Sequence, residues 1–219
     1  MSPTVVVCIG DSITFGNREL GGEPYPDRLQ ALLGASFRVV NAGMNGGGIV
    51  PSDRQVYHGG EEWRRAMAAG GDILVVMLGT NDTAPWNRAG NPLFASSYAT
   101  FIDELRALSP RSQVVLCTPP PIDTSFPGID APHSTILGGL IVPVIIGMAA
   151  EAGLPLIDVY AALATRSGWL ADGVHPNDLG NRLLAETVHA GLGRLRLPIS
   201  MCDTPEQDQQ GTSSRFISS

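Results

Sequence analysis

The sequence predicts an α/β fold in which a mainly parallel, five-stranded sheet lies between two layers of helices. Two observations predict it. Short apolar runs alternate with helix-length segments along the chain, and each run is continuously apolar instead of alternating with polar residues. Continuously apolar strands are typical of parallel sheets that are covered on both faces. Parallel neighbours joined by helices need right-handed crossovers, which give three layers.

Each apolar run is predicted as one strand of this sheet. The five strands are Thr4–Ile9, Arg38–Asn41, Ile73–Leu78, Gln113–Cys117 and Leu156–Asp158. The five helices expected between and after them are Tyr25–Leu33, Glu61–Ala69, Phe94–Leu108, Thr135–Ala152 and Asp178–Leu192.

The most apolar segment is the part of the fourth helix from Ile136 to Ala150. Its large apolar residues recur at helical spacing, and it is shorter than the roughly 20 residues that span a bilayer. We therefore interpret it as a buried helix, although an exposed part of it is a candidate dimer surface. Pro143 is expected either to kink this helix or to mark its true first turn.

The composition indicates one folded domain, which we place at residues 1–198. The chain has 219 residues, of which 43% are hydrophobic, and its net charge is −7. An acidic chain without basic runs argues against a nucleic-acid partner. The N-terminal segment has no charged n-region and its apolar run is too short for a signal peptide, so we expect a cytoplasmic protein without stable membrane insertion. Residues 199–219 are polar and aperiodic, which predicts a disordered tail.

The three cysteines do not indicate a metal site or a disulfide framework. Cys8 and Cys117 lie in predicted strands and are expected to be small buried residues, whereas Cys202 lies in the polar tail. The histidines have no spacing typical of metal ligands. We expect no metal and no cofactor.

A serine, a histidine and an aspartate occupy positions from which they can act together. Ser12 follows the first strand, and Asp172-Gly173-Val174-His175 precedes the last helix. Asp172 can turn back to hold the imidazole Nδ1–H, which leaves Nε2 facing the serine hydroxyl. Taken singly, Ser12 can instead be a turn serine that caps a helix, and the Asp–His pair can cap backbone amides.

Two further segments can supply donors to an oxyanion. Asn81 follows the third strand, and Gly43 follows the second, so the Asn81 amide and the N–H groups of Gly43 and Ser12 are candidates. The alternatives are an Asx turn at Asn81 and a flexible glycine turn at Gly43. We assign Asp82 to bracing its loop and Asp11 to local hydrogen bonds.

Three long loops follow strand ends, where open α/β sheets bind ligands. They span residues 43–60, 80–92 and 118–134. Trp86 in the second loop is a candidate for lining the substrate site, and it can equally be a core anchor or an exposed turn residue.

Taken together, these segments resemble the GDSL-type esterases of the SGNH hydrolase superfamily, which is named for Ser, Gly, Asn and His in four blocks. The matching residues are Ser12, Gly43, Asn81 and His175, with Asp172 three positions before the histidine. Ile13 stands where the family's leucine is usual. The resemblance implies a flavodoxin-like α/β/α sandwich and a metal-free hydrolase.

The expected activity is hydrolysis of carboxylic esters of short acyl groups through an acyl-serine, with O-acetylated carbohydrate as a candidate substrate. A small-molecule ester would be the partner, and the oligomeric state stays open. Lysophospholipase or thioesterase activity is the main alternative, and a non-catalytic binding module on the same fold is a second one. A nucleotide-binding domain is disfavoured because the chain has neither G-x-G-x-x-G nor a P-loop lysine.

Overall fold

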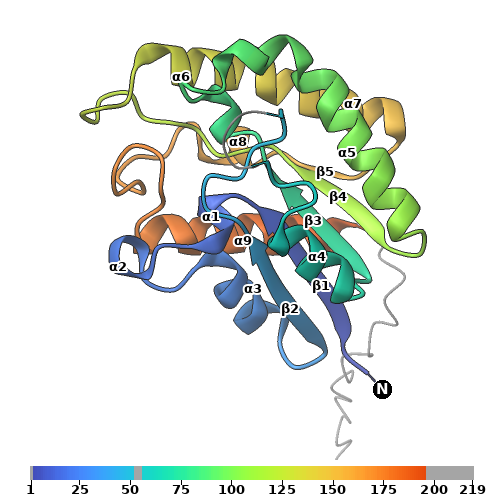
Figure 1. Ribbon diagram of the computed structural model, residues 1–219. Coiled ribbons are helices and arrows are strands. Elements are labelled where there is room, and N and C mark those ends of the chain that lie inside the picture. Colours follow the sequence, from blue (N-terminus) through green and yellow to red (C-terminus); the bar gives the residue numbers. More distant parts are fainter. Residues whose placement is uncertain (1, 52–55, 196–219) are drawn as a thin grey trace, which may run out of the picture.

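The computed structural model describes residues 2–51 and 56–195, which form a single parallel sheet flanked by helices (Figure 1). The strands follow the order β2-β1-β3-β4-β5, and every neighbouring pair is parallel. This is the flavodoxin-like order. The strands are β1 (Thr4–Gly10), β2 (Phe37–Gly43), β3 (Ile73–Met77), β4 (Gln113–Cys117) and β5 (Leu156–Ile157). The predicted five-stranded α/β fold is therefore confirmed.

Both faces of the sheet are covered, because successive side chains of a strand point to opposite faces. In β1, Val7 and Ile9 belong to one core cluster, and Val6 and Cys8 belong to the other. The first face packs against α4 (Glu61–Ala68), α5 (Phe94–Leu108) and α7 (Val142–Ala152). The second packs against α1 (Ser12–Phe15), α3 (Tyr25–Leu33), α8 (Val159–Leu163) and α9 (Asp178–Arg194). Figure 1 shows α5 and α7 on one side of the sheet and α3 and α9 on the other.

Several short elements were not predicted from the sequence. They are α1, α2 (Arg18–Gly21), α8 and the 3-10 turns Asn81–Thr83 and Arg88–Leu93. Segments of three to six residues are too short to show a helical period. Side-chain caps stabilise some of them: the carboxylate of Asp11 accepts a hydrogen bond from the Ile13 N–H, and Asn17 caps α2 in the same way.

The long apolar helix begins earlier than predicted, at Ala131 instead of Thr135, because Asp130 caps it and Pro132 fits its first turn. A π-helical turn, Leu137–Ile141, joins α6 (Ala131–Ile136) to α7. Pro143 lies in the first turn of α7, which is the second of its two predicted positions.

One face of this helix, with Leu137, Ile141 and Ile145, is buried in the core, as predicted, whereas Ile146 is 37% exposed. By length and composition alone, the stretch Ala131–Ala152 is apolar enough to cross a membrane. The expected cytoplasmic location and the lack of membrane insertion stay predictions. The domain boundary at 198, the tail at 199–219 and Cys202 fall outside the described residues.

Candidate active site

The fold brings together the three residues predicted to act as nucleophile, base and acid. Ser12 begins α1 immediately after β1, which lies inside the sheet, and His175 comes from the loop before α9. Although the two residues are 163 positions apart, Ser12 Oγ lies 2.9 Å from His175 Nε2. His175 Nδ1 lies 2.7 Å from Asp172 Oδ2. These distances are those of hydrogen bonds, so a proton can pass from the serine to the imidazole.

The conformation of the loop of residues 171–177, here called the histidine loop, is fixed by the Asp172 side chain and by Gly173. Asp172 Oδ1 accepts hydrogen bonds from the N–H groups of Val174 (3.0 Å) and His175 (2.7 Å). Gly173 has φ +91°, and a Cβ atom there would lie 2.6 Å from the Asp123 carbonyl oxygen. Only glycine fits both constraints. One carboxylate therefore fixes the loop with one oxygen and the imidazole with the other.

The pKa of Asp172 bears on whether this side chain is charged when it holds the imidazole of His175. Burial by itself raises the pKa of Asp172, but hydrogen bonds from the His175 N–H and imidazole and from the Val174 N–H outweigh it. The net effect is a pKa below the ordinary aspartate value. Asp172 is therefore ionised at neutral pH and can stabilise a positively charged imidazolium beside it.

Two of the predicted oxyanion donors lie at neighbouring strand ends. The Ser12 N–H opens α1, and the N–H groups of a first helical turn have no partner within the helix. Asn81 follows β3, which pairs with β1. Its Nδ2 donates to the Gly47 carbonyl at 3.1 Å, and its own carbonyl accepts from Asn87 Nδ2 at 2.7 Å. Among the described residues, Asn81 Nδ2 makes no hydrogen bond other than the one to Gly47.

Gly43 is placed differently from the prediction. It is buried, and its N–H donates to Asn41 Oδ1 at 2.9 Å, so this donor is already paired. A Cβ atom at Gly43 would lie 2.1 Å from the Phe15 backbone nitrogen. Gly43 thus lets α1 pack closely on β2, and the geometry argues against the donor role predicted for it.

The turn that follows Gly43 offers a better donor. The Gly47 N–H donates to the Met44 carbonyl at 3.0 Å, which closes a turn around Gly46 at φ +72°. Gly46 is exposed, and within the described part of the chain its N–H makes no hydrogen bond. Because Asn81 binds the carbonyl of Gly47, this turn is held against the asparagine.

The acidic residues next to Ser12 and Asn81 are buried. Asp82 accepts hydrogen bonds from the N–H groups of Ile49 and Val50. It is structural, as predicted, but the loop that it braces is the glycine-rich one and not its own. Asp11 is 1% exposed, and its Oδ1 accepts from the Ile13 N–H, also as predicted. Burial raises the pKa of Asp11 to about 6, although the Ile13 hydrogen bond partly opposes this shift.

The buried Asp11 should make stability depend on pH. Because its pKa rises from 3.8 to about 6 on folding, the folded protein binds this proton more tightly than the unfolded chain. The stabilisation is complete below the unfolded pKa and is lost as the pH rises through about 6, by about 3 kcal/mol. Asp11→Asn cannot ionise and keeps the acceptor for Ile13. The free energy of unfolding of the wild type relative to this variant should fall by about 3 kcal/mol between acidic and alkaline pH in urea titrations.

Asp103→Asn, on the exposed face of α5, is the matched control for this experiment. The free energy of unfolding of the wild type relative to Asp103→Asn should not fall by a comparable amount between acidic and alkaline pH. A difference between wild type and Asp11→Asn that is independent of pH would contradict the expectation.

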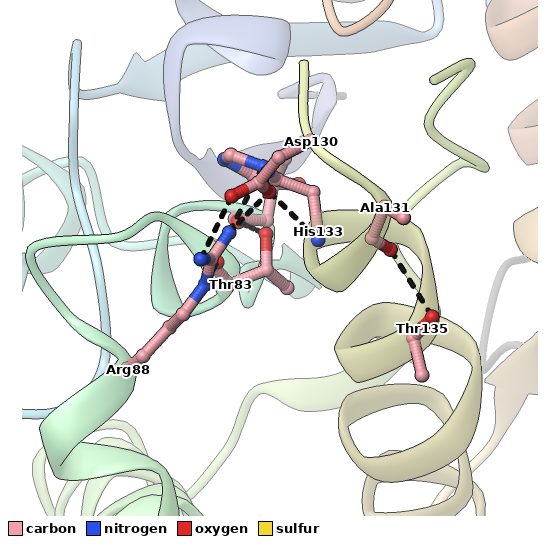
Figure 2. Close-up of polar contacts among 7 residues, drawn as sticks. Thr83, Arg88, Asp130, Ala131, His133 and Thr135 are labelled. Carbon is pink, nitrogen blue, oxygen red and sulfur yellow. Dashed lines mark hydrogen bonds and ion pairs between the residues drawn. The ribbon is translucent and has the colours of Figure 1, made fainter. Parts of the chain in front are cut away.

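A second polar cluster joins two loops near the site (Figure 2). Arg88 binds both carboxylate oxygens of Asp130, with a 2.9 Å hydrogen bond to Oδ2, and its Nε donates to the Thr83 carbonyl. His133 Nδ1 lies 2.5 Å from Asp130 Oδ1. The hydrogen bonds from Arg88, assisted by His133, lower the pKa of Asp130 to about 2. The cluster ties the segment after Asn81 to the start of α6.

Sequence reasoning missed this cluster, although a signal was present. Asp130 and His133 have the same three-residue spacing as Asp172 and His175, and both pairs hydrogen bond through Nδ1. Arg88, however, occupies both oxygens of Asp130, so this second pair serves to connect loops.

The remaining predictions on site residues have mixed outcomes. Trp86 is 53% exposed on the loop after Asn81, and its role in lining the substrate site stays a prediction. Cys8 and Cys117 are buried free thiols, as predicted. Across residues 2–51 and 56–195, no group of three or more His, Cys, Asp or Glu side chains is placed to hold a metal ion.

Comparisons with known proteins find similar chains among esterases and lipases. The chain is 29% identical over 207 residues to an acetylxylan esterase of Xylanibacter ruminicola, covering 85% of this chain but only 42% of that protein. It is 29% identical over 193 residues to a GDSL lipase of Mycobacterium tuberculosis, covering 84% and 79% of the two chains. The aryl esterase of M. smegmatis has the same fold, with a TM-score of 0.72, 21% identity and coverage of 87% and 98%.

The family model of the GDSL-like lipases and acylhydrolases matches residues 8–183. This match includes Ser12, Asn81 and His175, the residues on which the predicted resemblance depends. The chain therefore belongs to the GDSL-like lipase/acylhydrolase family.

Proposed function

We propose that the protein hydrolyses carboxylic esters of short acyl groups through an acyl-serine intermediate. The observation that carries the proposal is the hydrogen-bonded series from Ser12 Oγ to His175 Nε2 and from His175 Nδ1 to Asp172. A serine hydroxyl is a weak nucleophile unless an adjacent base removes its proton. Here the base is in contact with the hydroxyl, and an ionised carboxylate orients the base.

The reaction then proceeds in two acyl transfers. His175 takes the proton of Ser12 as the oxygen attacks the ester carbonyl, and it returns that proton to the leaving alcohol. A water molecule next gives a proton to His175 and attacks the acyl-serine, which releases the acid and restores Ser12. Asp172 stabilises the imidazolium in both steps.

The negative charge on the tetrahedral intermediate needs donors that are already in place. We assign this role to the Ser12 N–H and to the second amide hydrogen of Asn81. Gly46 takes the place first predicted for Gly43, because its N–H lies in the turn held by Asn81 and has no partner among the residues described.

The identity to an acetylxylan esterase supports acetylated carbohydrate as the substrate class. An acetyl group needs little apolar surface, whereas a long acyl chain needs a groove that excludes water. Because the chain spans less than half of that relative, the substrate stays a proposal. Lysophospholipase and thioesterase activity are the alternatives.

A series of p-nitrophenyl esters tests the acyl preference. We expect kcat/KM to be highest for the acetyl and butyryl esters and to fall for the octanoyl and dodecanoyl esters. A maximum at dodecanoyl would reject the short-chain proposal and favour a lysophospholipase. If no ester or thioester is hydrolysed and a fluorophosphonate probe does not label Ser12, the protein is a binding module.

A further inference from the structure

A pocket of about 350 Å³ opens beside the histidine loop, between residues of segments 121–126 and 163–170. We call it the side pocket. Its volume lies at the lower end of the range of roughly 300–1,000 Å³ that small-molecule sites have. Neither Ser12 nor Asn81 lines it, so the proposed chemistry does not account for it.

The side pocket shares a wall with the histidine loop. Leu170, which lines the pocket, pairs with Pro176 in an antiparallel bridge, and the Ala171 N–H donates to the His175 carbonyl at 2.8 Å. From the other wall, the Asp123 N–H donates to the Gly173 carbonyl at 2.9 Å. Both walls are thus bonded to the loop that carries the catalytic base, so the pocket lies beside that loop.

The lining combines an apolar floor with a polar rim. Ile122, Leu163 and Trp169 are buried beneath the pocket. The rim has the exposed carboxylate of Asp123 and the exposed guanidinium of Arg166, together with the hydroxyls of Thr124 and Ser167. Within residues 2–51 and 56–195, the Arg166 guanidinium has no hydrogen bond or ion pair.

An apolar floor with one carboxylate and one guanidinium at its rim favours one class of ligand over others. Asp123 Oδ1 already accepts from the Ser125 N–H at 2.9 Å. A long acyl chain would cover the charge of Asp123 and would leave the Arg166 guanidinium unpaired, which is costly. A net charge on the ligand would be attracted by one of the two groups and repelled by the other. A neutral sugar satisfies both, because its hydroxyls donate to Asp123 and accept from Arg166 while its C–H faces cover the apolar floor.

We propose that the side pocket is a subsite for a neutral sugar unit of the substrate, adjacent to the unit whose ester is cleaved. The inference rests on the proposed ester hydrolysis and names the part of the substrate that lies beyond the acyl group. The sugar chain passes over the histidine loop, with its ester group at Ser12 and its neighbouring unit between Asp123 and Arg166.

The test compares two substrates that differ in whether they reach the pocket. An acetylated xylo-oligosaccharide reaches both sites, whereas p-nitrophenyl acetate reaches only Ser12. Arg166→Ala should lower the ratio of the two kcat/KM values, oligosaccharide over p-nitrophenyl acetate, on the order of 10-fold, since it removes hydrogen bonds from a charged donor. Arg182→Ala, an exposed arginine of α9, is the matched control and should keep the wild-type ratio.

A second variant tests the same subsite by filling it. Ala164 lines the pocket, whereas Ala162 is exposed nearby and does not. Ala164→Trp should lower the ratio at least as much as Arg166→Ala, and Ala162→Trp should keep it.

The outcomes separate the two proposals. If the wild type hydrolyses neither substrate, the proposed function fails. If it hydrolyses p-nitrophenyl acetate but not the oligosaccharide, or if both pocket variants keep the wild-type ratio, ester hydrolysis stands and the sugar subsite is rejected.

Discussion

Ser12→Ala is expected to lower kcat for p-nitrophenyl acetate by a factor on the order of 10⁴–10⁶. The methyl group cannot attack the carbonyl, so the acyl-serine does not form and only the donors that stabilise charge remain. The fold should persist, because Ser12 Oγ makes its hydrogen bond to His175 and lies outside both core clusters. Initial rates with purified variant and wild type measure the effect, and circular dichroism checks the fold.

Ser96→Ala is the matched control for this experiment. Ser96 is an exposed serine on α5 whose hydroxyl donates to the Leu93 carbonyl, so its removal should leave kcat within about twofold. If Ser12→Ala keeps more than a few per cent of the wild-type rate, another residue is the nucleophile and the mechanism is wrong.

Asp172→Asn should have the second largest effect, a loss in kcat on the order of 10³–10⁴-fold. The carboxylate holds His175 through Nδ1 and so directs the unprotonated Nε2 at Ser12. An amide can hold the ring in the other tautomer, in which Nε2 carries the proton and cannot act as a base. It also removes the charge that stabilises the imidazolium. Pre-steady-state kinetics would measure the loss in acylation and in deacylation, both of which use His175 as the base.

The second Asp–His pair of the chain supplies the control. Asp130→Asn changes a carboxylate with the same spacing to its histidine, but one that faces Arg88. Its effect on kcat should be no more than about 10-fold, because it alters only the connection between loops. Equal losses in the two variants would mean that Asp172 acts by holding the loop and not by orienting the base.

Much of the site could be predicted because its residues follow strands. The apolar runs before Ser12 and Asn81 identify two parallel strands, and parallel strands place their carboxyl ends at one edge of the sheet. The spacing of Asp172 and His175 also predicted a local contact, since three residues can turn back on themselves. These predictions depend on neighbours in sequence or on a repeated pattern.

The donors of the oxyanion could not be assigned in the same way. Gly43 is the last residue of β2 and Gly46 lies three positions further on, and the sequence offers no reason to prefer either. The difference arises from Asn41, whose side chain takes the Gly43 N–H, and from Phe15, whose backbone leaves no room beside Gly43. The bond between Asn41 and Gly43 spans only two residues, but the Asn41 side chain is oriented by its hydrogen bonds to the Thr14 and Phe15 carbonyls of α1, which no local pattern encodes.

The sequence by itself determined the α/β fold and its strands, and it predicted that Ser12, His175 and Asp172 form one site, because continuous apolar strands and short motifs are local features. Only the tertiary structure decided which glycine N–H has no partner among the described residues, that Arg88 joins two loops through Asp130, and that a side pocket lies beside the histidine loop. Each of these depends on contacts between segments far apart in the chain. The reason is physical: whether a polar group is paired or available is decided by its neighbours in space, and those are known only after the chain has folded.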